Sequence, residues 1–143
     1  MGKSFVLSIS LGTGCYRHIQ ISEDATLDDL HHEIMCMFDF DDDHLYQFCM
    51  DNRLWGSGAV YMCQRVDYLT DELGYTDEVE LGELSIGKGS KFVYVFDFGD
   101  CWVFQIKVLR IVDETTPTPK ILKSVGEVSQ YGDDEDEDED DEF

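Results

Sequence analysis

Hydrophobic and polar residues alternate along several segments of the chain, most clearly between residues 91 and 111. Aromatic and β-branched residues occupy every second position on both sides of a Gly99-Asp100 break. This alternation is typical of strands, and a Gly-Asp break between two strands predicts a β-hairpin. We therefore expect a C-terminal hairpin extension over Phe92–Ile111, with Asp97 and Asp100 at the shoulders of its turn.

The N-terminal part predicts a hairpin followed by a helix. Segments 4–11 and 16–21 alternate like strands around a Gly-Thr-Gly turn. Apolar residues then recur at helical spacing over Leu27–Phe38. Thr26 is a favourable N-cap, and aspartates in the first turn complement the helix dipole. His31 shares the apolar side of this helix.

Later segments give shorter signals. Residues 45–50 predict a third strand, 59–63 a possible short strand, and 79–84 a tight segment. The stretch 53–78 shows no clear periodicity. A Thr-Pro-Thr-Pro sequence predicts an extended linker, and one short element packed on the body is expected within 120–131.

This element order is that of a β-grasp, and residues 80–96 resemble the end of ubiquitin-like domains. We expect an α+β fold with a β-grasp-like mixed sheet, one main helix packed on one face, and the hairpin as an extension. Residues 1–131 would form a single domain, followed by a disordered acidic tail over 132–143. The expected core comprises Phe5, Leu7, Ile9, Leu30, Ile34, Phe48 and Val95.

The charge of the chain limits its partners. The formal net charge is −22, and the run Asp133–Glu142 supplies ten of these negative charges. The remainder is still acidic, so that direct binding of duplex DNA is disfavoured and basic protein partners are favoured. The acidic run repels itself and has nothing to bury, which predicts disorder.

No secretory or membrane-spanning pattern is found, which predicts a cytoplasmic protein without membrane association. The cysteines are odd in number and lack Cys-x-x-Cys spacing, which favours reduced thiols that pack as small apolar residues. They are Cys15, Cys36, Cys49, Cys63 and Cys101.

Two motifs carry a resemblance to a known family. The segment 25–48 contains ATLDDLH followed by DDDHLYQF, and 94–102 reads YVFDFGDCW. Together with Pro-Lys-Ile at 119–121 and the glycines and aromatic residue of 126–132, they resemble the plasmid pRiA open-reading-frame-three-like family, also labelled insertion-element passenger TnpR-like. The resemblance implies a small protein linked to mobile elements, but no established reaction. Phe104 stands where the family commonly has histidine.

The strongest candidate site combines Asp97, Asp100 and His44. In the expected fold, the end of the hairpin strand meets the start of the third strand, and the acidic loop 39–43 arrives at the same edge. Converging carboxylates could bind Mg²⁺ or Ca²⁺. The alternative is structural, with both aspartates fixing the turn and His44 capping a strand.

Two further residues are binding candidates. His31 could be a ligand or base, although a histidine on an apolar helix face is more often buried and hydrogen-bonded. Trp102 and the neighbouring aromatic residues could stack nucleobases, although the hairpin needs them to pack against the helix.

Three functions are compatible with these patterns. The first is a non-enzymatic protein-binding or adaptor module with a basic partner and no cofactor. The second is a metal-dependent hydrolase or nucleic-acid-processing accessory that uses the Asp97/Asp100 edge. The third is a nucleic-acid mimic, or a self-masked nucleic-acid binder whose tail covers the basic residues of the C-terminal third. No nucleophile elbow or phosphate-loop spacing is present.

Overall fold

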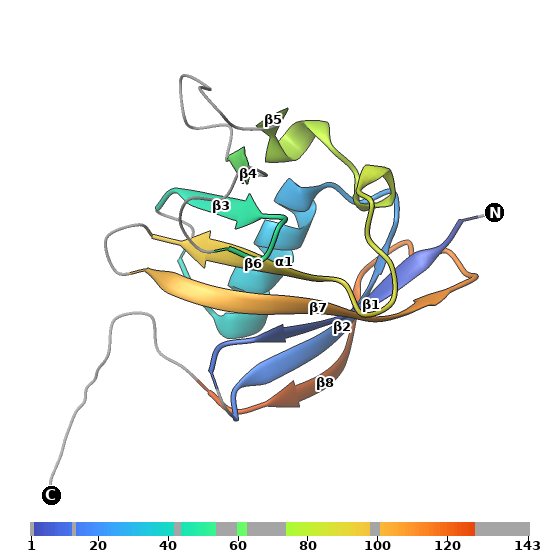
Figure 1. Cartoon of the computed structure of the whole chain (residues 1–143). Coiled ribbons are helices and arrows are strands. Elements are labelled where there is room, and N and C mark those ends of the chain that lie inside the picture. The colour runs from blue at the N-terminus through green and yellow to red at the C-terminus, as the bar shows by residue number, and fades with distance from the viewer. Residues whose placement is uncertain are drawn as a thin grey trace, which may run out of the picture.

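One long helix lies across one face of a single large sheet in the computed structural model (Figure 1). The structure describes residues 2–12, 14–41, 44–53, 60–62, 74–97 and 101–127. Within these ranges the sheet has eight strands in the order β5-β4-β3-β6-β7-β1-β2-β8. The expected α+β class, with a helix packed on a sheet, is confirmed. No helix in the described ranges is long and apolar enough to cross a membrane.

The elements follow the sequence patterns closely in the first half of the chain. The helix α1 spans Leu27–Phe38, and two short 3₁₀ helices span Thr76–Glu78 (η1) and Leu81–Glu83 (η2). The strands are β1 Ser4–Ser10, β2 Tyr16–Ser22, β3 Tyr46–Cys49, β4 Val60–Met62, β5 Gly74–Tyr75, β6 Lys91–Phe96, β7 Trp102–Val112 and β8 Lys120–Val125.

The strand order differs from the one expected of a β-grasp. In the expected arrangement, β6 would complete the sheet between the first and third strands. In the structure β6 pairs with β3, but β7 lies between β6 and β1. The reason is the length of β7, whose residues Trp102–Lys107 pair with β6 while Gln105–Val112 pair with β1.

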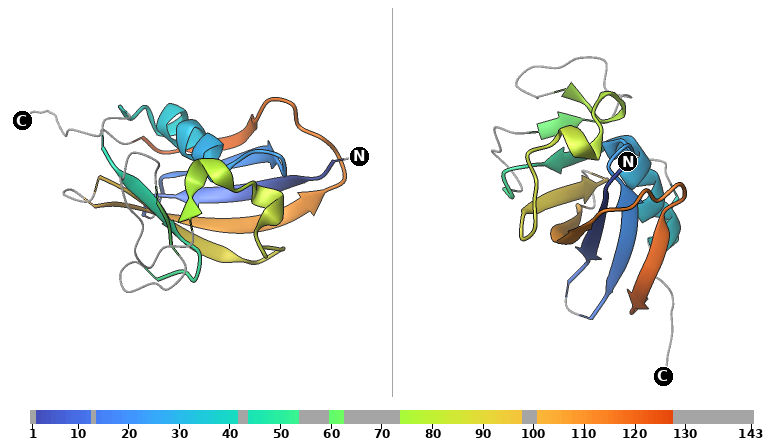
Figure 2. Two further views of the ribbon diagram at one scale, coloured as in Figure 1. Left: turned by 90° about the horizontal axis from the view of Figure 1, so that it is seen from above. Right: turned by 90° about the vertical axis from the view of Figure 1, so that its right-hand side faces the viewer.

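The β6 and β7 strands are antiparallel neighbours, with Lys91 opposite Lys107 and Phe96 opposite Trp102. They do not extend the sheet at its margin, however. They lie in its middle, between β3 and β1, and the margins are β5 and β8 (Figure 2). The expected extension over Phe92–Ile111 is therefore a central part of the sheet.

Local chemistry sets both ends of α1. The Thr26 side chain accepts a hydrogen bond from the Asp29 N–H (3.0 Å), and the Asp29 carboxylate accepts one from the Thr26 N–H (2.9 Å). This reciprocal capping box satisfies two backbone donors at the start of the helix. Asp39 ends the helix in the left-handed region, at φ 58°. The predicted N-cap and helix end are confirmed.

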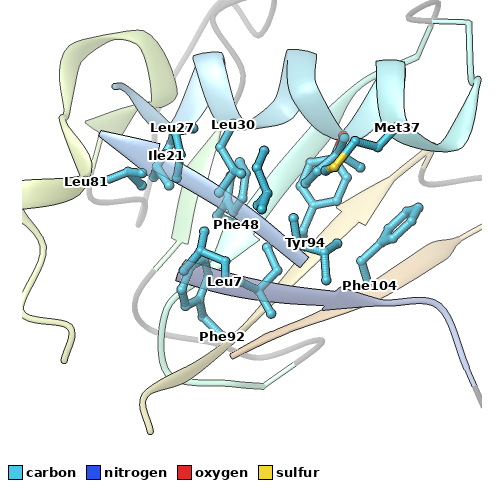
Figure 3. Close-up of a cluster of buried hydrophobic side chains, with 14 of the residues drawn as sticks. Leu7, Ile21, Leu27, Leu30, Met37, Phe48, Leu81, Phe92, Tyr94 and Phe104 are labelled. Carbon is cyan, nitrogen blue, oxygen red and sulfur yellow. The ribbon is translucent and has the colours of Figure 1, made fainter. Parts of the chain in front are cut away.

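The main core lies between α1 and the sheet (Figure 3). All seven residues expected in the core are buried. Val95 differs from the other six because it does not lie in the main core. It packs with Cys49, Val60 and Val93 on the other face of the sheet. The cause is the two-residue period of β6, which turns Tyr94 and Phe96 toward the helix and Val95 away from it.

The later expectations had mixed outcomes. The short strand expected within 59–63 is β4, and the tight segment at 79–84 contains η2. The short element expected within 120–131 is β8, which pairs antiparallel with β2. Asp100, Gly99 and Cys63 lie outside the described residues, as does the proposed tail over 132–143.

Candidate functional site

The structure brings Asp97 and His44 together at the end of β6. Asp97 directly follows β6, and the antiparallel pairing of Tyr46 with Phe96 places the start of β3 beside it. The His44 Nε2 atom lies 3.4 Å from the Asp97 Oδ2 atom. The Asp97 side chain is 9% exposed and that of His44 is 38% exposed. This proximity agrees with the arrangement predicted for the two residues.

Two backbone hydrogen bonds hold Asp97 at the end of β6. Its N–H donates to the Leu45 carbonyl (2.8 Å), and its own carbonyl accepts from the Cys101 N–H (2.6 Å). Asp97 has φ 64° and Cys101 has φ 55°, both in the left-handed region. Aspartate tolerates this region better than most residues do. These contacts and the backbone conformation of Asp97 support a structural role for this residue.

Trp102 serves the packing of this edge. It begins β7 and packs edge-on against the Phe40 ring, with centroids 5.0 Å apart and an interplanar angle of 74°. Its indole N–H is buried and has no hydrogen-bond partner among the described residues. Phe104, which stands at the family's usual histidine position, packs in the main core against Phe38. An apolar ring at this position suits a site surrounded by aromatic residues.

The described residues at this edge do not assemble a full set of metal ligands. Asp97 and His44 supply one carboxylate and one imidazole, and Asp100 lies outside the described ranges. Within those ranges, no group of three or more histidine, cysteine, aspartate or glutamate side chains could hold a metal ion. Mg²⁺ and Ca²⁺ usually need several oxygen ligands.

The Asp97→Asn variant tests whether this edge is structural or binds a metal. We expect a loss of stability of about 1–2 kcal/mol, because the amide keeps the shape but loses the charge that faces His44. We also expect Mg²⁺, Mn²⁺ and Ca²⁺ to leave the melting temperature of the wild type unchanged. Thermal unfolding with and without each ion measures both effects. A metal-induced rise in the wild type that Asp97→Asn removes would contradict the structural role.

His31 is buried in the core beneath α1 and is 1% exposed. Its Nδ1 atom lies 2.5 Å from the Tyr94 hydroxyl oxygen. Its ring also stacks face to face on Tyr46, with centroids 3.7 Å apart and an interplanar angle of 4°. This closed, aromatic surrounding agrees with the packing alternative for His31, in which the residue is buried and one ring nitrogen is hydrogen-bonded.

The Tyr46 hydroxyl forms a second group of polar contacts beside His31. It donates to the Asp28 carboxylate (2.5 Å) and lies 2.6 Å from the Thr76 hydroxyl. Asp28 in turn lies 3.6 Å from the His32 Nδ1 atom. These contacts join β3, α1 and η1. Buried networks of this kind fix the arrangement of the elements that they connect.

A groove of about 450 Å³ lies beside α1. It is enclosed by the helix, the end of β2 and the segment 115–119. Its lining is acidic and partly apolar. Three carboxylate side chains line it, and no lysine or arginine is found among its described lining residues. These residues are Ile21, Ser22, Asp24, Ala25, Asp29, His32, Glu33, Thr115, Thr116, Pro117 and Pro119.

A buried hydrogen-bond network holds the far wall of the groove in place. The Ser4 hydroxyl donates to the Glu114 carbonyl (2.7 Å) and lies 2.6 Å from the Thr116 hydroxyl oxygen. The Gln20 side-chain amide donates to the Thr116 hydroxyl oxygen (2.9 Å). Because Ser4 has a single proton, Thr116 must donate to Ser4 and accept from Gln20. The groove is therefore a preformed feature of the fold.

The pKa of the Glu33 carboxyl, which lines the groove, is raised. Burial raises the pKa of Glu33; His32 lowers it and the neighbouring Asp29 raises it further. A carboxyl whose pKa is raised gains from a positive charge placed beside it. Because the pKa of Glu33 is higher in the folded protein than in the unfolded chain, protonation of its carboxyl favours folding. This stabilisation is complete at pH values below the ordinary glutamate pKa and is lost as the pH rises through the raised pKa. Glu33→Gln should therefore not destabilise the protein at neutral pH.

The sequence patterns did not indicate this groove. Its two walls come from residues 21–33 and 115–119, which are far apart in the chain. Only the polar run Glu114-Thr115-Thr116 before two prolines could have served as a signal, and such a run is also typical of an ordinary linker.

Two comparisons with known proteins give matches. The family model described as "Plasmid pRiA4b ORF-3-like protein" matches residues 5–135. A crystal structure of a protein of unknown function, MM3350 from Methanosarcina mazei Go1, is similar with a TM-score of 0.68 and 23% sequence identity. The similarity covers 87% of this chain and 70% of that one and shows a shared fold. No curated protein matches.

Proposed function

The chain belongs to the plasmid pRiA4b ORF-3-like family, whose function is not known, and on this premise we propose that it is a non-enzymatic protein-binding module. Its partner carries a lysine- or arginine-rich segment. The groove between α1 and the segment 115–119 receives a basic side chain of that segment.

The acidic lining of a preformed groove carries this proposal. Asp24, Asp29 and Glu33 provide carboxylates on one side, and Pro117 and Pro119 provide apolar surface on the other. A lysine or arginine side chain matches this combination, because its apolar stem can pack on the prolines while its charged end meets the carboxylates. The volume is in the range typical of ligand sites.

A labelled basic peptide tests the proposal. Fluorescence anisotropy with an eight-residue peptide of alternating lysine and glycine, at physiological salt, measures the affinity. We expect the double variant Asp24→Asn/Glu33→Gln to bind it roughly tenfold more weakly, because two charge-assisted contacts are lost. The affinity should also fall as the pH falls and Glu33 becomes protonated.

A matched control separates the groove from the general acidity of the protein. Asp77→Asn/Glu78→Gln removes the same charge from exposed positions in η1. This variant should bind the peptide nearly as well as the wild type, since the acidic run is present in both variants. An equal loss of affinity in the two variants would contradict a role for the groove.

We extend the proposal to a cytoplasmic location and to a link with mobile genetic elements. The plasmid in the family's name supports the second point. The genes that lie beside homologous genes in several genomes would test it: recurrent transposase or plasmid-maintenance neighbours are expected. The metal-dependent alternative rests on the Asp97–His44 pair and is tested by the Asp97→Asn measurement.

A further inference from the structure

The sheet face opposite α1 carries a row of basic side chains in an otherwise acidic protein. Lys91 of β6 pairs with Lys107 of β7, and Lys107 pairs with Ser8 of β1. Ser8 pairs with His18 of β2, which pairs with Lys123 of β8. Directly opposite residues project from the same face, so that the row crosses five neighbouring strands (Figure 1). At about 4.8 Å per strand it is about 19 Å long.

Two more cations join this row. Arg110 pairs with Val6, which lies two residues from Ser8 in β1. Lys120 pairs with Gln20, which lies two residues from His18 in β2. Because every second residue of a strand projects from the same face, both cations share the face of the row. Arg110 reaches this face through a bulge, because Leu7 pairs with Val108 and Val6 pairs with Arg110. We call the following set the basic face: Lys91, Lys107, Arg110, Lys120, Lys123 and His18.

The basic face is exposed, and the Glu114 carboxylate reaches it at Gln20, the partner of Lys120. All five lysine and arginine residues are exposed. Within the described part of the chain, none of them forms a salt bridge with a carboxylate. The pKa of His18 is lowered by burial and then by the positive charges of Lys123 and Arg110. Five exposed cations on one face create a positive potential that attracts an anionic segment.

The chain itself supplies such an occupant. β8 ends at Val125, opposite Tyr16 and two residues from His18. The run Asp133–Glu142, with ten carboxylates, begins eight residues later. Eight extended residues span up to about 27 Å, which exceeds the length of the row. A tethered segment at this distance has a millimolar effective concentration, an advantage that a separate nucleic acid lacks.

We propose that the acidic run Asp133–Glu142 binds the basic face of its own chain and keeps other polyanions off it. The contact is electrostatic and needs no fixed tail conformation. It goes beyond the proposed function, because it uses the opposite face of the sheet and a different ligand charge.

The 143-residue chain with a neutral tail tests this proposal. Each acidic residue from Asp133 to Glu142 is replaced by its amide, Asp→Asn or Glu→Gln, which keeps the length of the chain. Amide NMR shifts of the two proteins at low salt should differ mainly at the basic face. The His18 pKa should be higher in the wild type, since tail carboxylates stabilise its imidazolium form. Both differences should vanish at about 0.5 M salt.

Binding of a fluorescein-labelled twenty-residue oligothymidine gives a second measurement. If the tail occupies the basic face for about nine-tenths of the time, the amide variant should bind roughly tenfold tighter than the wild type. In the background Lys107→Glu/Lys123→Glu, the tail exchange should no longer alter the NMR shifts. Arg53→Glu, an exposed residue after β3 near the other margin of the sheet, should leave the tail effect in place.

Three outcomes would overturn the proposal. One is that the tail exchange leaves the NMR shifts of the basic face unchanged. Another is that wild type and amide variant bind the oligonucleotide equally tightly, in which case an external polyanion is the occupant. The third is that Arg53→Glu abolishes the tail effect as fully as the double variant does, which would show unspecific attraction. None of these results depends on the peptide measured at the groove.

Discussion

Replacing Leu30 by alanine should lower the free energy of unfolding by about 2–5 kcal/mol. Leu30 is fully buried in the layer between α1 and the sheet, close to Phe48 and Ile21 (Figure 3). The truncation removes apolar contacts and leaves a cavity that a rigid sheet cannot fill. Urea denaturation at physiological salt, followed by far-ultraviolet circular dichroism, measures the change.

An exposed residue on the same helix provides the control for Leu30. Cys36 is exposed, so Cys36→Ala should change stability by no more than about 0.5 kcal/mol. Both substitutions place alanine in α1, so that differences in helix propensity contribute little to the comparison of the two variants. A loss at Leu30 as small as that at Cys36 would contradict the packing of this part of α1 on the sheet.

The helix and the first three strands could be predicted because burial leaves a repeating pattern in their sequences. Thr26 and Asp29 also carry a local capping signal, which depends only on neighbouring residues. β8 gave no comparable signal. Its residues Lys120–Ser124 are exposed, so that no alternation of buried apolar and exposed polar residues marks the strand in the sequence.

The order of the strands could not be predicted from local patterns. β7 alternates like any strand, and nothing in its sequence indicates that it pairs with β1 in addition to β6. The position of Arg110 depends on the same pairing. Strict alternation from Val108 places Arg110 on the helix side, and the bulge in the β1–β7 pairing places it on the opposite face. Register shifts of this kind arise from tertiary pairing.

The two candidate sites also differ in how far the local sequence predicts them. Asp97 and His44 were predicted to be close, because the ends of two paired strands meet wherever the strands pair antiparallel. The acidic groove depends instead on Thr116, whose hydroxyl is held by Ser4 and Gln20, about a hundred residues earlier in the chain. A single threonine in a polar linker does not reveal such partners in advance.

Arg17 joins three elements through one buried guanidinium, and Arg17→Met should therefore lower stability by about 2–4 kcal/mol. Its Nε atom donates to the Met37 carbonyl in the last turn of α1 (3.2 Å), and its Nη1 atom donates to the Val125 carbonyl at the end of β8 (2.8 Å). The guanidinium also stacks on the Phe38 ring, 4.6 Å from its centroid. Methionine retains much of the apolar stem but leaves the carbonyls without this donor.

The effect of Arg17 on stability depends on its place beside the C-terminal end of α1, because the helix has no basic residue in its own last turn. Arg17 supplies from β2 the positive charge that the negative end of the helix dipole favours. Arg17→Lys should recover part of the loss, since a lysine keeps the charge but cannot donate in two directions from a planar group. Chemical denaturation of both variants, beside Arg53→Met as an exposed control outside the basic face, separates these contributions. If Arg53→Met destabilises the protein as much as Arg17→Met does, general charge balance accounts for the loss, and the proposed link between α1, β2 and β8 fails.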